Sequence, residues 1–291
     1  MTTQQNKPFA LHLREQRWHA NSNSPGSNTV VFLHGLGDSA DIWLPILKEW
    51  PGGREFEAVA FDLPGHGGSD WLEPDEYTAT AMASAVTKVL LENEIDRPIL
   101  IGHSLGARIA LEIAADGEVA PLLTVLIDMS PDAVTGEPSD SQMSVADHID
   151  TLITGANSAD ELINVVKDRL PLADLAALTE VIYAQIMAHP RPSSKRISVS
   201  LDPELKTLVT SALRADAWQL LGEAMSPVAI VRGEYSGVLD RATAERMTTE
   251  VIRCVANETI KLAGHAILLE QPQALAETLA KIVKQRLKVI S

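Results

Sequence analysis

The sequence predicts an α/β protein with a mainly parallel, eight-stranded sheet that is flanked by helices. Short apolar runs rich in β-branched residues alternate with longer segments of helical period, which is the pattern of successive strand–helix–strand units. Apolar residues make up 45% of the 291 residues, enough to bury a large core. The alternation stops in one place, so we expect one large domain with an insertion.

The first two expected strands form an antiparallel pair, and the other six form the body of the sheet. Their ranges are Phe9–Leu13, Arg17–Ala20, Thr29–Leu33, Glu57–Phe61, Pro98–Ile101, Leu122–Ile127, Pro227–Val231 and Glu258–Leu262. Helices are expected in the intervals. The clearest is the last helix, whose apolar residues recur on one stripe at positions Leu275, Leu279, Ile282, Val283 and Leu287.

The insertion lies between Pro131 and Gly222, where consecutive helical patterns replace the alternation. Ser158 followed by Glu161 is a capping box that opens an amphipathic helix. Asp202 before Pro203 marks another helix start. We therefore expect a core domain of residues 1–130 and 223–291, with a helical cap of residues 131–222 over the C-terminal edge of the sheet.

Charge and composition argue against nucleic-acid and membrane-surface partners, and the partner we expect is a small-molecule substrate. The formal net charge of −15 repels phosphate backbones and anionic headgroups, so no nucleic acid and no membrane surface is expected. The sequence shows no signal-peptide core and no apolar run near the ~20 residues of a membrane span, which predicts a cytoplasmic protein. We expect it to be a monomer or a homodimer. Cys254 is the single cysteine, and we expect neither a metal site nor a cofactor.

Ser104 is the candidate nucleophile. The strand Pro98–Ile101 runs into Gly102-His103-Ser104-Leu105-Gly106 and then into a helical segment. A serine hydroxyl is a weak nucleophile, so it must be exposed on a tight turn where a base can reach it, and flanking glycines supply the room. Gly-x-Ser-x-Gly in this strand–turn–helix context predicts such a nucleophile.

His265 is the candidate base. It follows the last predicted strand within Ala263-Gly264-His265-Ala266. A base for Ser104 must sit at the C-terminal edge of the same sheet, and the end of a strand holds an imidazole there.

The loop after the strand Thr29–Leu33 is the candidate oxyanion-binding segment. It reads His34-Gly35-Leu36-Gly37. Acyl transfer develops a negative oxygen that needs two preorganised donors, and we expect these to be the backbone N–H groups of Leu36 and Leu105.

These elements, together with the segment Asp62–Ser69, resemble the signature set of the α/β-hydrolase superfamily. The resemblance covers nearly the whole chain and implies a serine hydrolase that cleaves an ester, thioester, amide or C–C bond through an acyl-enzyme. It also implies that Asp62–Ser69 is a structural loop at the site's edge, in which neither Asp62 nor His66 is catalytic.

The third triad member departs from the family pattern. Most members carry the acid in a Gly-x-x-Asp arrangement after the strand that follows the cap, but here that stretch ends in Ser236. Asp128 closes the strand next to the nucleophile strand and so points at the same edge. We therefore predict a Ser104–His265–Asp128 triad, with Asp240 as the substitute for the acid.

Arg108 lies one helical turn beyond Ser104 and is expected to pair with a carboxylate of the protein or to bind one of the substrate. The stretch Gly102–Arg108 followed by Asp128 is similar to that of acetamidomethylenesuccinate hydrolases, which act on small carboxylated substrates. Cap arginines could complete such a pocket, namely Arg169, Arg191 and Arg214.

Three other readings stay open from the sequence. The run Gly35–Ala40 also fits Gly-x-Gly-x-x-Gly/Ala, with Asp62 as a ribose-binding acid, so an NAD(P)-binding oxidoreductase is one alternative. A cofactor-independent dioxygenase or lyase on the same fold is another. A receptor that retains the triad without catalysis is the third.

Overall fold

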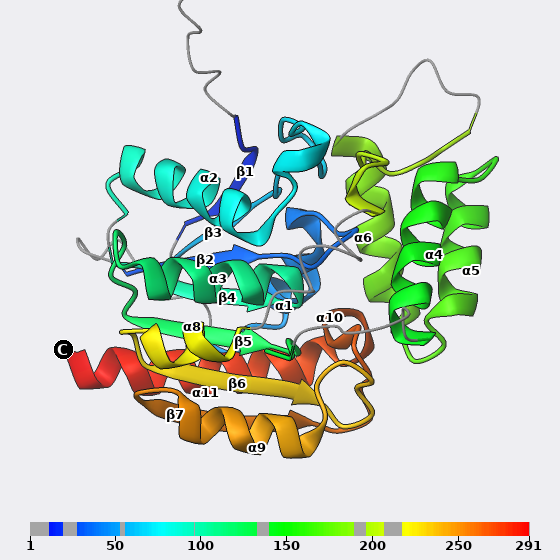
Figure 1. Ribbon diagram of the computed structural model, residues 1–291. Helices are drawn as coiled ribbons and strands as arrows, with labels where there is room; N and C mark the ends of the chain where they lie inside the picture. Colours follow the sequence, from blue (N-terminus) through cyan, green and yellow to red (C-terminus); the bar gives the residue numbers. More distant parts are fainter. Residues whose placement is uncertain are drawn as a thin grey trace, which may run out of the picture.

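One sheet of seven strands forms the centre of the molecule. The computed structural model describes residues 12–19, 28–52, 56–95, 97–132, 140–188, 196–206 and 217–290. The strand order is β1-β3-β2-β4-β5-β6-β7, and only β1 runs antiparallel to its neighbour (Figure 1). The strands are β1 (Glu15–Trp18), β2 (Thr29–Leu33), β3 (Glu57–Phe61), β4 (Ile99–His103), β5 (Leu123–Ile127), β6 (Val228–Gly233) and β7 (Cys254–Ile260). The α/β class predicted from the sequence is confirmed.

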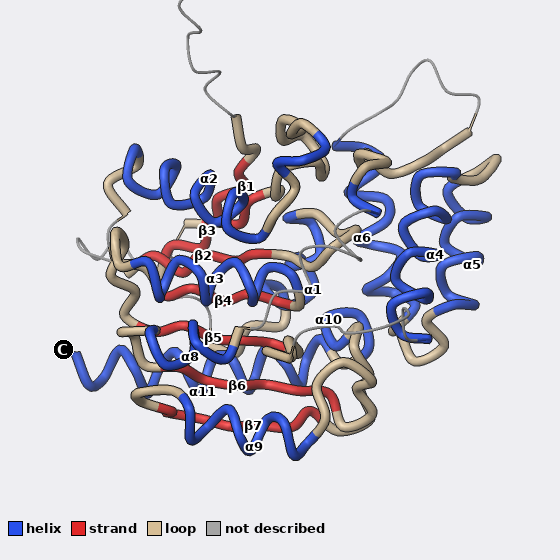
Figure 2. Tube along the Cα trace, viewed as in Figure 1, coloured by secondary structure: helices blue, strands red, loops and turns tan. Residues whose placement is uncertain are grey.

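Helices cover both faces of this sheet (Figure 2). One face carries α2 (Ala79–Glu92), α3 (Leu105–Asp116), α8 (Trp218–Glu223) and α9 (Arg241–Glu250), and the other carries α1 (Leu44–Lys48) and α11 (Pro272–Ile290). The strands β4 and β5 are buried at every position, as expected for parallel strands covered on both faces. The predicted stripe of the last helix is also found, because Leu275 and Leu279 of α11 lie in the core.

The edges of the sheet differ from the prediction. The expected strand Phe9–Leu13 lies mostly outside the described residues, and its described part pairs with a loop instead of a strand. There the backbones of His12 and Arg14 bond to Asp70 and Ser69. At the other edge, β7 starts earlier than the predicted Glu258–Leu262, because its residues alternate between partly buried and exposed and so form no continuous apolar run.

The chain between β5 and β6 contains α4 (Asp140–Thr154), α5 (Ala159–Arg169) and α6 (Leu175–Ala188). In Figure 1 the arrowheads of β5 and β6 point toward the side of the molecule on which these three helices lie. The Ser158 side chain accepts a hydrogen bond from the Glu161 N–H at 3.1 Å, which caps α5 as the sequence indicates. Short 3-10 helices, η1 (Ala40–Trp43) and η2 (Pro74–Glu76), and a short helix α10 (Ile267–Glu270) complete the described elements.

Candidate active site

Ser104 stands on a sharp turn between β4 and α3. Its φ of 52° and ψ of −115° are rare for a residue with a side chain, and such strain is typical of a nucleophile turn. The two glycines of the motif allow the close approach that this turn requires. A Cβ on Gly102 would lie 2.2 Å from the Gly106 carbonyl oxygen, and a Cβ on Gly106 would lie 2.2 Å from that of Leu33.

The structure brings Ser104, His265 and Asp128 together although the chain separates them widely. His265 follows β7, and its Nε2 lies 3.1 Å from the Ser104 Oγ. Its Nδ1 lies 2.7 Å from the Asp128 Oδ2. A carboxylate can only accept, so Nδ1 carries the hydrogen and Nε2 presents a lone pair to the serine hydroxyl. This is the tautomer that a general base for Ser104 requires.

The Asp128 carboxylate is fully buried and is held by two further donors. The Gly233 N–H donates to its Oδ1 at 3.0 Å, and the Ser236 hydroxyl donates to its Oδ2 at 2.5 Å. The Ser236 Oγ in turn accepts the N–H groups of Val238 and Leu239, so its own hydrogen is directed at the acid. The serine at the expected acid position therefore supports a carboxylate that comes from β5.

Asp240, the substitute candidate for the acid, has a different role. Its side chain accepts the Thr243 N–H at 2.7 Å and caps α9. The structure does not bring it to His265.

The two predicted oxyanion donors are not used elsewhere. Among the described residues, no protein acceptor is recorded for the backbone N–H of Leu36 or of Leu105. Leu36 also lines the cavity beside Ser104. The absence of a protein acceptor, among these residues, is what an oxyanion donor requires.

Two buried histidines hold the loop that contains Leu36, and sequence reasoning missed this role. The Nδ1 of each ring donates to a backbone carbonyl nearby in the chain. The Nε2 of each ring accepts a backbone N–H from the loop that contains the other histidine. His34 accepts from Leu63 at 2.9 Å, and His66 accepts from Gly37 at 3.1 Å. Burial lowers the pKa of both rings, to about 3 for His66, which keeps them neutral acceptors. The two His-Gly dipeptides that follow neighbouring strands were the available signal.

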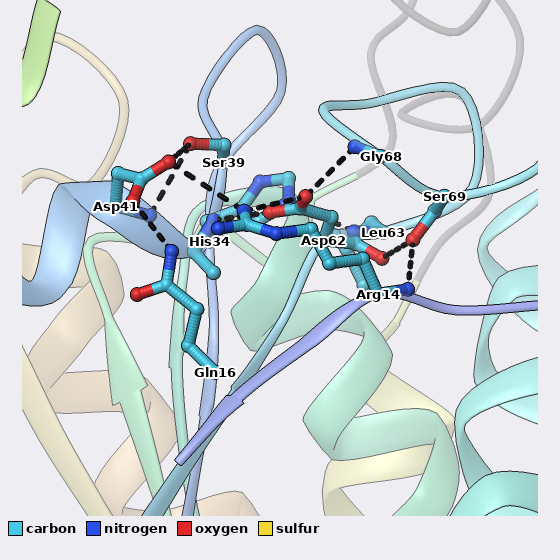
Figure 3. Close-up of polar contacts among 10 residues, drawn as sticks. Arg14, Gln16, His34, Ser39, Asp41, Asp62, Leu63, Gly68 and Ser69 are labelled. Atoms are coloured by element: carbon cyan, nitrogen blue, oxygen red, sulfur yellow. Dashed lines mark hydrogen bonds and ion pairs between the residues drawn. The ribbon is translucent and has the colours of Figure 1, made fainter. Parts of the chain in front are cut away.

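The Asp62 carboxylate lies at the centre of the contacts in the same region (Figure 3). Its carboxylate accepts the Ala40 N–H at 2.7 Å and the Gly68 N–H at 2.9 Å, and it pairs with the Arg14 guanidinium at 2.9 Å. Its side chain is fully buried. These contacts leave it no approach to a ribose, which removes the basis for reading it as part of a dinucleotide site.

A cavity of about 210 Å³ opens over Ser104. Its lining combines apolar side chains with acids and imidazoles. The lining side chains are Leu36, Asp38, Ile42, His103, Ser104, His148, Leu170, Val238, His265, Ala266, Leu268, Leu269 and Glu270. Its size fits a small substrate better than a long chain.

The arginines considered from the sequence do not line this cavity where they are described. Arg108 donates to Glu112 at 3.0 Å, and Arg169 lies 3.9 Å from Asp147. Arg191 and Arg214 lie outside the described residues. Over the part of the chain that the structure describes, no cluster of His, Cys, Asp and Glu has the arrangement of a metal site, and no helix is long and apolar enough to cross a membrane.

Comparison with known proteins places this geometry in context. A family model described as "Alpha/beta hydrolase family" matches residues 30–278. An esterase of Mycobacterium tuberculosis is 27% identical over 272 residues, which cover 88% of this chain and 83% of the esterase. A 2-succinyl-6-hydroxy-2,4-cyclohexadiene-1-carboxylate synthase of Pectobacterium atrosepticum is 36% identical over 99 residues, which cover 34% of this chain and 37% of the synthase.

Solved structures share the fold over most of the chain. An E-2-(acetamidomethylene)succinate hydrolase superposes with a TM-score of 0.75 at 18% identity, covering 94% of this chain and 95% of that one. A thioesterase domain from the curacin biosynthetic pathway superposes with a TM-score of 0.72 at 18% identity, covering 92% and 95%. Proteins with different names therefore share this framework, and the substrate has to be argued from the site.

Proposed function

Since the chain belongs to the alpha/beta hydrolase family, we propose that it is a serine hydrolase that cleaves a small ester, thioester, amide or C–C substrate through an acyl-enzyme. The observation that carries this proposal is the continuous hydrogen-bond path from Asp128 through His265 to the Ser104 Oγ. No step in this chemistry needs a cofactor, because the side chains supply nucleophile, base and acid.

The first half of the reaction forms the acyl-enzyme. The Ser104 Oγ attacks the scissile carbonyl carbon as its proton passes to the His265 Nε2, and Asp128 stabilises the resulting imidazolium. The carbonyl oxygen becomes negative and accepts the N–H groups of Leu36 and Leu105. The intermediate collapses when its bond to the leaving group breaks and His265 returns the proton to that group.

The second half regenerates the enzyme with water. His265 takes a proton from a water molecule, whose oxygen attacks the acyl carbon bound to Ser104. The oxyanion forms again and collapses, the bond from Ser104 to the acyl group breaks, and the proton returns from His265 to the serine oxygen.

We further propose that the helices within residues 131–222 act as a cap over this site. Two side chains from this stretch line the cavity, His148 of α4 and Leu170 after α5. The short helix α8 packs instead against α3 on a face of the sheet, so in this proposal the cap ends before Trp218. Exchange of residues within α4 to α6 is expected to change substrate preference more than the chemical step.

Labelling with a fluorophosphonate tests the nucleophile. The wild-type protein should take up one equivalent on Ser104 and hydrolyse p-nitrophenyl butanoate, and Ser104→Ala should abolish both. Ser84→Ala is the matched control, because Ser84 is exposed on α2 away from the cavity, and it should behave as the wild type. Full turnover of a substrate by Ser104→Ala would exclude the acyl-enzyme and favour a lyase or dioxygenase reaction on this fold.

A further inference from the structure

The turn between α5 and α6 places an apolar residue in the lining of the cavity beside Ser104. Leu170 follows the last residue of α5, and the helix ends there because Pro171 has no N–H and disfavours a helical residue before it. The Leu170 side chain is partly buried and packs against the main apolar core, and the residue lines the cavity. The end of α5 thus presents an aliphatic side chain to the site.

A lysine side chain closes this turn. The Lys167 Nζ donates to the carbonyl oxygen of Pro171 at 2.9 Å and to that of Ala173 at 2.5 Å. The Ala173 N–H donates in turn to the Leu170 carbonyl oxygen at 2.9 Å. Hydrogen bonds from an ammonium group are stronger than those between neutral groups, so they hold the backbone that follows Leu170 in one conformation. We call these three contacts the Lys167 clamp.

The same turn is also bonded to the segment that follows His265. The Asp174 N–H donates to the Leu269 carbonyl oxygen at 2.6 Å. Leu269 belongs to α10, which begins two residues after His265, and it also lines the cavity. The Asp174 side chain accepts the Ala177 N–H at 2.8 Å and so caps α6. A movement of the turn away from the cavity would therefore disturb bonds to both α6 and α10.

The cavity that Leu170 helps to bound is small. A dry cavity of about 150 Å³ in a protein holds benzene. On that scale the 210 Å³ beside Ser104 holds about eight non-hydrogen atoms. Leu36, Ile42 and Val238 supply further apolar lining. A short acyl group with its ester fits this volume, whereas a long acyl chain would have to displace part of the wall.

We propose that Leu170, held by the Lys167 clamp, sets the upper limit on the acyl chain, so that this enzyme prefers acyl groups of about two to four carbons. This inference rests on the proposed function. In an open apolar pocket each added methylene strengthens binding, so kcat/KM would rise with chain length. A fixed wall reverses this trend, because a misfit of one methylene in an apolar pocket changes kcat/KM by about 10–200-fold.

A series of p-nitrophenyl esters tests the limit, namely acetate, butanoate, hexanoate and octanoate. The wild-type kcat/KM should fall by at least about 10-fold from butanoate to octanoate, and Leu170→Ala should raise the octanoate-to-butanoate ratio by about 10-fold or more. Lys167→Met removes the clamp and should raise the same ratio. The ratio for two substrates on one protein does not depend on the folded fraction, so a loss of stability alone leaves it unchanged.

Leu172→Ala and Lys88→Met are the matched controls. Leu172 lies in the same turn but is 48% exposed and outside the cavity lining, and Lys88 is exposed on α2. Both variants should keep the wild-type ratio. An equal rise in Leu172→Ala would overturn the role of Leu170, and an unchanged ratio in Lys167→Met would overturn that of the clamp.

Calorimetric binding of the same esters to Ser104→Ala, with and without Leu170→Ala, measures the limit without turnover. Weak binding of the octanoate ester that Leu170→Ala relieves supports the wall even if the wild-type protein hydrolyses none of the esters, an outcome that would reject only the proposed function. A wild-type preference for octanoate, or an octanoate-to-butanoate ratio that Leu170→Ala leaves unchanged in both measurements, would overturn the inference.

Discussion

Replacement of Asp38 by asparagine should stabilise the folded protein as the pH rises through neutrality. Burial raises the pKa of this carboxyl group from 3.8 to about 7, partly countered by the charge of nearby His265. Between these two values the folded protein holds a proton that the unfolded chain has released. The free energy of unfolding therefore falls as the pH rises across this window, and the loss is complete above the folded pKa.

The size of the effect follows from the shift. About three pKa units at ~1.36 kcal/mol each correspond to about 4 kcal/mol at most. The side chain keeps some contact with solvent at the cavity, which reduces this figure, and part of the loss occurs below pH 5. We expect Asp38→Asn to gain about 1–3 kcal/mol over the wild type between pH 5 and pH 8, because the amide has no proton to lose.

Urea unfolding of the two proteins at pH 5, 6, 7 and 8 measures this difference. The slopes of the two unfolding curves should agree, so that the midpoints report stability alone. Asp75→Asn, which removes an exposed carboxylate, should show no comparable trend. A constant difference between Asp38→Asn and the wild type at all four pH values would mean that the carboxyl ionises normally in the folded state, and would refute the reasoning.

Three further predictions concern the site and its support. Asp128→Asn should fold normally and lower kcat by about 10⁴-fold, the loss that the same change causes in serine proteases. Adding Ser236→Asp to this variant should restore part of the activity, because the two side chains lie 2.5 Å apart. A near-normal kcat in the single variant would reject Asp128 as the acid. His66→Leu removes the acceptor for the Gly37 N–H and so loosens the loop of the proposed oxyanion donor Leu36. The kcat should fall by about 10–100-fold with little change in KM, which steady-state kinetics on p-nitrophenyl butanoate would measure. Tyr77→Phe deletes the donor to the buried Asp202 carboxylate at 2.6 Å and should destabilise the fold by about 1–3 kcal/mol in urea unfolding, and an unchanged midpoint would contradict this role.

The parts of the structure that the sequence predicts well are those set by local pattern and by sheet topology. The strands β2 and β3 have the predicted bounds, because buried parallel strands form continuous apolar runs. The placement of Asp128 beside His265 follows from topology, because β4 and β5 are neighbours and their carboxyl ends meet at one edge. The eighth expected strand, Phe9–Leu13, lies mostly outside the described residues, so the seven described strands do not test it.

The features that sequence reasoning did not reach depend on the directions of side chains from distant segments. The donation from Ser236 to Asp128 spans 108 positions of the chain, and no periodicity encodes it. The mutual support of His34 and His66 requires two loops to fold against each other. The raised pKa of Asp38 depends on burial at the cavity, which becomes known only when the surrounding elements are packed.

The position of Asp128 directly after β5 has an evolutionary consequence. His103 at the end of β4 pairs in register with Ile127 at the end of β5, so the ladder between these strands fixes the spacing of Ser104 and Asp128. The long helical excursion before β6 begins only after both residues are in place. Different helices could therefore be grafted there, by recombination or by design, without moving Ser104 relative to Asp128. Only the contacts of His265 with Ser104 and Asp128 would have to form again.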